Sequence, residues 1–167
     1  MNKILNYPRR KNIRLKIYNY KQNGAYFITI CNQNRVSLWG EIIDDVMVLN
    51  EAGLMIEKWL FKMDDKFENF SIDGMVIMPN HLHFILIIDE VEKKNDISVS
   101  QVVQWFKAMT TNEYIKEVRR GVFPPFYKRI WQRNYYENII RNETSFNEIQ
   151  KYIEENPRKW KEDVLYL

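Results

Sequence analysis

The chain has 167 residues, of which 46% are hydrophobic and 28% charged, and its formal net charge is +3 at pH 7. This composition can bury a core, so it excludes a disordered or low-complexity chain and predicts one folded domain over residues 1–167. The single cysteine excludes an internal disulfide framework, and no secretory leader or membrane-spanning apolar run is visible, so we expect a cytoplasmic protein without a membrane partner.

The first predicted elements are two strands and a helix. Residues 24–31 are rich in β-branched and aromatic side chains and predict a strand, and residues 46–49 predict a short edge strand. Asn50 can cap the helix that follows, because its amide oxygen can accept a hydrogen bond from the first turn. Apolar residues recur from there at helical spacing to about residue 66, which predicts the length of the helix.

Two more strands and a second helix are predicted next. Residues 70–78 and 82–88 read as strands joined by a Pro-Asn turn, and the second is apolar at nearly every position, so it should be central. A polar loop precedes the second helix, which Ser98 or Ser100 can cap. Its apolar stripe continues until Gly121 and the two prolines behind it, which should end the helix.

A final strand and helix complete the pattern. Residues 136–140 predict a strand, and Thr144 or Ser145 can cap a last helix over residues 144–156, before an Asn-Pro pair. The order is β-α-β-β-α-β with an appended helix. It predicts the α+β, ferredoxin-like (RRM-like) fold, an antiparallel sheet with two helices on one face.

Basic residues are concentrated at the N-terminus. Residues 1–40 hold eight lysines and arginines and no acidic residue, whereas the remainder of the chain is acidic overall. A basic arm over residues 1–22 suits a polyanion such as nucleic acid. The alternative is a solvated terminal segment without a partner. The arm residues that we expect to contact DNA are Arg9, Arg10, Lys11 and Arg14.

A second basic segment spans residues 119–133, where five basic residues are interleaved with aromatic ones and no acidic residue occurs. Cations for phosphates beside flat rings for bases are typical of a surface that binds single strands. The alternative is a loop whose arginines are simply solvated. The residues that we expect to contact DNA here are Arg119, Arg120, Lys128, Arg129, Trp131 and Arg133.

The only two histidines of the chain, His81 and His83, lie two positions apart at the start of a predicted strand. Side chains alternate along a strand, so both imidazoles should project from the same, open face of the sheet, with Leu82 and Phe84 toward the helices. Two neighbouring imidazoles make half of a divalent-metal site. The alternative is a pair at the edge of a turn with ordinary hydrogen bonds.

The last predicted helix offers a partner for the histidines. Tyr152 and Asn156 are four residues apart, so they share one helical face that borders the apolar stripe. A tyrosine hydroxyl can attack a phosphodiester when a metal ion polarises the phosphate. The asparagine carbonyl oxygen is a hard ligand suited to an ion such as magnesium.

Several segments together resemble a known family. His81, Leu82 and His83 look like the His-hydrophobic-His motif of the HUH endonucleases that use a single catalytic tyrosine. The resemblance is closest to the REP-associated tyrosine transposases and their insertion-sequence relatives, and it covers nearly the whole chain. The segments that carry it include RRKNIRL, GAYFITICNQNR, VIMPNHLHFIL, IWQRNYYENIIRNE and KYIEENPRKW.

The resemblance implies a metal-dependent endonuclease that cleaves and rejoins single-stranded DNA near hairpins. It places His81, His83 and Asn156 at the metal-ligand positions, for magnesium or manganese, and Tyr152 at the position of the nucleophile. Tyr135 and Tyr136 are left as DNA-contacting or core residues. Cleavage would leave a 5′-phosphotyrosine and a free 3′-hydroxyl. A DNA substrate implies a nucleoid-associated protein, and because relatives are commonly dimers, a homodimer is one expected assembly.

Two other hypotheses stay open at this point. A non-catalytic nucleic-acid-binding module would explain the basic and aromatic segments, because the same sheet is the scaffold of RNA-recognition domains. It would leave the histidine pair unexplained. A domesticated transposase would keep the site without mobilising its own gene, and the DNA that flanks the gene would distinguish it from a mobile enzyme.

Overall fold

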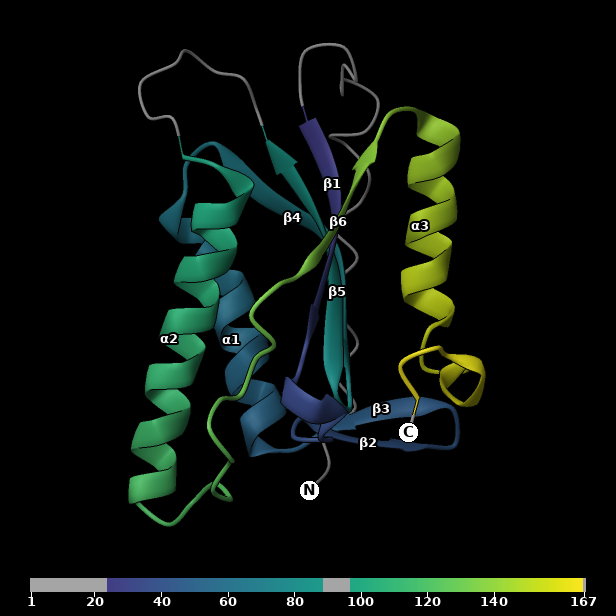
Figure 1. Ribbon diagram of the computed structural model, residues 1–167. Helices are drawn as coiled ribbons and strands as arrows, with labels where there is room; N and C mark the ends of the chain where they lie inside the picture. The colour runs from purple at the N-terminus through teal and green to yellow at the C-terminus, as the bar shows by residue number, and fades with distance from the viewer. Residues whose placement is uncertain (1–23, 89–96, 167) are drawn as a thin grey trace.

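The structure is a computed structural model that describes residues 24–88 and 97–166 (Figure 1). The predicted basic arm, with Arg9, Arg10, Lys11 and Arg14, lies outside the described residues. The elements are β1 (Gly24–Cys31), η1 (Gln33–Arg35), β2 (Gly40–Ile43), β3 (Val46–Leu49), α1 (Glu51–Lys66), β4 (Phe70–Met78), β5 (His81–Ile88), α2 (Val99–Arg119), β6 (Tyr136–Ile140), α3 (Glu143–Glu155) and η2 (Trp160–Glu162).

The main sheet has four antiparallel strands in the order β4-β5-β1-β6. Its strands and the helices α1 and α2 follow one another in the predicted β-α-β-β-α-β order, which is confirmed. Strands β2 and β3 form a separate two-stranded ribbon, of which only β3 was predicted. Its two-residue turn, Asp44 and Asp45, has positive φ at both positions. Such turns usually carry Gly at the second position, after Asn, Asp or Gly, so the Asp-Asp pair was a weak turn signal and strand β2 was not predicted.

The two faces of the sheet carry different helices (Figure 1). Leu82, Phe84 and the other residues of β5 in phase with them pack into the large core beneath α1 and α2. The alternate residues of β5 face α3, where Ile85 joins a smaller apolar cluster with Phe146 and Ile153. The predicted alternation is confirmed, but the prediction of an open face was wrong: α3 covers it and the histidines are buried.

Polar caps begin each of the three α-helices. Asn50 accepts from the backbone of Gly53 at the start of α1, as predicted, and Ser98 forms a reciprocal capping box with Gln101 in α2. The cap of α3 is Asn142, whose side chain accepts from Ser145 at 2.8 Å, so the predicted Thr144 or Ser145 cap was wrong. Within the described residues, no helix is both long and apolar enough to cross a membrane.

Candidate functional site

The histidine pair lies at the end of the sheet where β5 begins. His81 and His83 are 0% and 3% exposed, and their Nε2 atoms are 3.0 Å apart. Both rings therefore direct the same nitrogen toward one point between them. This convergence follows from the two-residue period of the strand, which places the side chains side by side on the face covered by α3.

Asn80 determines which nitrogen of His81 carries the hydrogen. Its Nδ2 donates to the backbone carbonyls of Arg35 at 3.2 Å and Leu165 at 2.9 Å, which fixes the orientation of the amide. Its Oδ1 therefore faces His81 Nδ1, at 2.8 Å, and must accept a hydrogen from it. The Nε2 of His81 therefore carries no hydrogen, and its lone pair is available to a metal ion, as a metal ligand requires.

Burial keeps both imidazoles neutral. It lowers the pKa of His81 and of His83 well below the usual range of histidine, although the carboxylate of Asp163 opposes the shift at His81. Neutral imidazoles carry the lone pairs that bind cations, so the pair needs no deprotonation at neutral pH.

Asp163 joins the pair, and Asn156 lies next to it, with its Nδ2 donating to Asp163 Oδ2 at 3.4 Å. Asp163 Oδ2 lies 3.9 Å from His81 Nε2, and the donor atoms of His81, His83 and Asp163 all lie within 4.8 Å of one another. Asn156 is 2% exposed, and its Oδ1 is a buried oxygen without a hydrogen-bond partner. An unpartnered buried acceptor calls for an explanation, and a bound cation would supply one. The residues present therefore fit a divalent metal ion.

Asp163 is a site residue that sequence reasoning missed. It lies seven residues beyond Asn156, outside any long predicted element, and only the short η2 turn brings it back over the sheet. Hydrogen bonds hold this segment in place: Arg35 donates to the carbonyl of Val164 at 3.2 Å, and the Leu165 amide donates to Asp163 at 2.7 Å. The available signal was an acidic side chain shortly after the Asn-Pro pair, but no spacing rule predicts its position.

Tyr152 comes to the histidines from α3. Its ring packs against His83, with centroids 5.4 Å apart, and against Phe27 at 5.9 Å, while 42% of the residue stays exposed. Burial raises the pKa of its hydroxyl, the charge of Asp163 adds to the shift, and an interaction with the Asn156 amide opposes it. The tyrosine thus lies between the buried cluster and the solvent.

The two other tyrosines considered lie elsewhere. Tyr135 donates its hydroxyl hydrogen to Glu137 at 3.0 Å. Tyr136 is 63% exposed and pairs with Thr29 across the β1–β6 ladder, which puts it on the same face of the sheet as His83 but two strands away.

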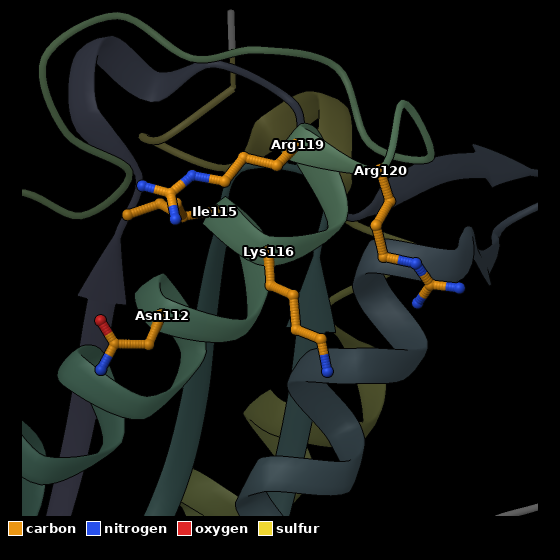
Figure 2. A pocket seen from close by; sticks show the side chains of 5 residues that line it. All are labelled: Asn112, Ile115, Lys116, Arg119 and Arg120. Atoms are coloured by element: carbon orange, nitrogen blue, oxygen red, sulfur yellow. The ribbon is translucent and has the colours of Figure 1, made fainter.

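The basic residues of the predicted 119–133 surface have different environments. Arg119 and Arg120 line a shallow hollow with Lys116 near the end of α2, where their side chains point away from one another (Figure 2). Arg120 is paired with Glu117. Lys128 and Arg133 are exposed, and Arg129 is half-buried. The end of α2 lies at the same end of the molecule as the start of β5 (Figure 1).

The prediction for Trp131 was wrong. Its ring is buried in the core between Trp39 and Phe106, and its indole nitrogen donates to the hydroxyl of Thr110 at 2.9 Å. A ring enclosed by other aromatic rings cannot present a face to a base. The aromatic residue of this segment that is well exposed is Tyr127, with Lys128 over its ring.

Comparison with known proteins decides the family. A family model described as transposase, IS200-like, matches residues 20–156. The chain belongs to this family. The resemblance to REP-associated tyrosine transposases is thereby confirmed at the level of the family, and the match includes the histidine pair, Tyr152 and Asn156.

Individual relatives of the chain are consistent with that assignment. A Haemophilus influenzae (strain Rd) protein of uncharacterised function is 40% identical over 95% of this chain and 93% of its own length. A second protein from that organism, described as a proposed REP-associated tyrosine transposase, is 25% identical over 84% of this chain and 73% of its own.

Solved structures share the fold. A REP-associated tyrosine transposase bound to a REP hairpin superposes with a TM-score of 0.58 at 24% identity, over 85% of this chain and 71% of that one. A Deinococcus radiodurans protein described as a proposed transposase gives 0.53 at 15% identity, over 82% of this chain and 92% of that one. The α+β sheet with its three helices is thus the architecture of both.

Proposed function

We propose that this protein is a metal-dependent endonuclease and strand transferase for single-stranded DNA that acts through a tyrosine. The observation that carries the proposal is the meeting of Tyr152, the histidine pair and Asp163 at one site, with the buried Asn156 bonded to Asp163. A nucleophile beside a preformed set of nitrogen and oxygen ligands is what phosphoryl transfer needs. A binding module would have no use for buried ligands without partners.

The donor set would suit a hard divalent ion. It combines two neighbouring imidazole nitrogens with carboxylate and amide oxygens. His81, His83 and Asn156 would hold magnesium or manganese, with Asp163 as a further donor. The bound ion would act as a Lewis acid on the phosphate oxygens.

The chain's own residues supply the remaining steps. Packing of Tyr152 against His83 and Phe27 limits the directions in which its hydroxyl can point. As the Tyr152 oxygen loses its proton and bonds to phosphorus, the phosphorus–O3′ bond breaks and the 3′ oxygen takes up a proton. The product is a 5′-phosphotyrosine, and attack by a 3′-hydroxyl on that bond would rejoin a strand and restore the tyrosine. Bond energy is conserved, so no nucleotide cofactor is required.

Basic residues near this end of the molecule support hairpin DNA as the substrate. Lys116 and Arg119 project from the last turns of α2, and the related transposase solved with DNA is bound to a REP hairpin. Cations of this kind contact phosphates without regard to sequence, so they would position a hairpin rather than select it.

The proposal is tested by metal removal. The full chain is incubated with an end-labelled single-stranded hairpin and magnesium or manganese, and a denaturing gel is read for a protein–DNA adduct. We expect an adduct with either metal and none in EDTA, because the phosphate would lose its Lewis acid. His83→Ala should also remove it. Undiminished cleavage in EDTA would overturn the metal assignment, and a wild type without any adduct would favour the binding module.

A second prediction concerns the cationic end of α2. The double change Lys116→Gln, Arg119→Gln should weaken hairpin binding and reduce the slope of log affinity against log salt by about 1 for each phosphate that the variant no longer neutralises. The matched control is Lys66→Gln, which removes a positive charge at the end of α1, toward the opposite end of the sheet (Figure 1). Fluorescence anisotropy at several salt concentrations provides the measurement. Equal slopes for the double variant and wild type would remove these residues from the DNA interface.

A further inference from the structure

A hydrogen atom must lie between the two histidines when no cation does. Their Nε2 atoms are 3.0 Å apart, a distance at which one nitrogen must donate and the other accept, because two facing lone pairs would repel. The Nε2 of His81 is the acceptor, since Asn80 keeps the hydrogen of His81 on Nδ1. His83 must therefore be the donor and carry its hydrogen on Nε2.

Thr29 makes that tautomer of His83 possible. Its hydroxyl oxygen lies 2.7 Å from His83 Nδ1, and the two residues are directly paired across the β1–β5 ladder. When His83 carries its hydrogen on Nε2, its Nδ1 has a free lone pair, and the Thr29 hydroxyl must donate a hydrogen bond to it. Thr29 is buried, so few other groups can take its place.

A metal ion requires the opposite arrangement at His83. Both Nε2 atoms must then be free of hydrogen, so that their lone pairs can face the ion. His83 therefore loses the proton on Nε2 and takes one up on Nδ1, and its imidazole stays neutral. The Thr29 hydroxyl can rotate to accept this hydrogen, because a hydroxyl both donates and accepts. An amide oxygen, such as the one Asn80 offers to His81, could only accept.

The ring of His83 cannot avoid this exchange by turning over. Phe27 is stacked on it, with centroids 5.2 Å apart and planes inclined by 20°, and Tyr152 packs edge-on at 5.4 Å. A rotation of the imidazole out of its plane would collide with the stacked ring. The change between the two states must therefore occur by moving hydrogens, not by moving the ring.

We infer that Thr29 is a positioning residue whose hydroxyl reverses its hydrogen bond to His83 when the site takes up a divalent cation. This inference rests on the metal site of the proposed function. It assigns different roles to the two supporting side chains: Asn80 holds His81 permanently ready for the metal, and Thr29 lets His83 change between a metal-free and a metal-binding tautomer. The outer hydrogen bonds of metal ligands commonly change metal affinity by about 10- to 100-fold.

The test compares Thr29→Val with Thr29→Ser. Valine keeps the shape and removes the hydroxyl, so manganese affinity, measured by electron paramagnetic resonance titration, should fall about 10- to 100-fold. Serine restores the hydroxyl and should restore the affinity. Thr110→Val is the matched control, because Thr110 is equally buried but lies on the α1–α2 side of the sheet, where its hydroxyl bonds to Phe106 and Trp131. Its affinity for manganese should stay at the wild-type value.

A second readout follows the hydrogen itself. Nitrogen-15 spectra of the two imidazoles should show His83 as the Nε2–H tautomer without metal and as the Nδ1–H tautomer with magnesium, whereas His81 stays Nδ1–H. A wild-type affinity in Thr29→Val, or an Nδ1–H tautomer of His83 before metal is added, would overturn the inference alone. A wild type that binds no manganese would instead overturn the metal site on which it rests.

Discussion

Tyr152→Phe should bind hairpin DNA and manganese as the wild type does, yet form no covalent adduct and cleave no strand. The substitution removes one hydroxyl group and keeps the ring that packs against His83 and Phe27. Without the hydroxyl oxygen no bond to phosphorus can form, so the loss should reach the detection limit. The measurement is the labelled adduct on a denaturing gel, together with anisotropy for binding.

The matched control is Tyr136→Phe. Tyr136 is exposed and lies on the same face of the sheet, but two strands from His83. We expect this variant to form the adduct at the wild-type level. An adduct that persists in Tyr152→Phe and vanishes in Tyr136→Phe would show that the nucleophile is Tyr136.

The second large effect is a loss of stability in mild acid. In EDTA, the free energy of unfolding should be flat from pH 8 to pH 7 and fall as the pH drops below about 6.5, the pKa of histidine in an unfolded chain. The folded state holds both imidazoles neutral, because burial lowers the pKa of each. The unfolded state therefore binds more protons, which stabilises it as the pH falls. Each histidine contributes about 1.4 kcal/mol per pH unit, and the loss stops only when the folded-state pKa is reached.

Urea unfolding at pH 7.5 and pH 5.2 provides the measurement. His81 and His83 are the only histidines, so the double variant His81→Gln, His83→Gln should lose much less stability between these two pH values. A wild-type curve as flat as that of the double variant would show that the imidazoles are protonated in the folded protein. Carbon-13 titration of the two histidines in the folded state gives the same answer independently of unfolding.

The parts of the site that could be predicted follow from local periodicity. The two-residue period of a strand places His81 and His83 together, and the four-residue spacing on a helix places Tyr152 and Asn156 on one face. Neither deduction needs to know how the strand and the helix meet. The covering of the histidines by α3 does depend on that meeting. The last helix was expected to partner the histidines, but their face of the sheet was expected to stay open.

Other parts depended on contacts that periodicity does not describe. Asp163 reaches the histidines through a short turn. The next two residues hold that turn in place, because the carbonyls of Val164 and Leu165 accept hydrogen bonds from the Arg35 and Asn80 side chains. Trp131 lies among basic residues in the sequence, but burying its large apolar ring in the core stabilises the fold more than exposing it would. The Thr110 hydroxyl accepts a hydrogen bond from its indole nitrogen. An aromatic residue beside arginines in the sequence can lie either in the core or on a DNA-binding surface, so composition alone could not tell which applies to Trp131.

The division of β5 between two faces also bears on how the gene can change over time. Leu82 and Phe84 hold the sheet against α1 and α2, and the protein needs them to fold whether or not it cuts DNA. His81 and His83, on the opposite face, are the proposed metal ligands. In a lineage released from selection for DNA cleavage, substitutions should therefore accumulate first at positions 81 and 83 of this strand, while Leu82, Phe84 and the apolar residues further along it are retained.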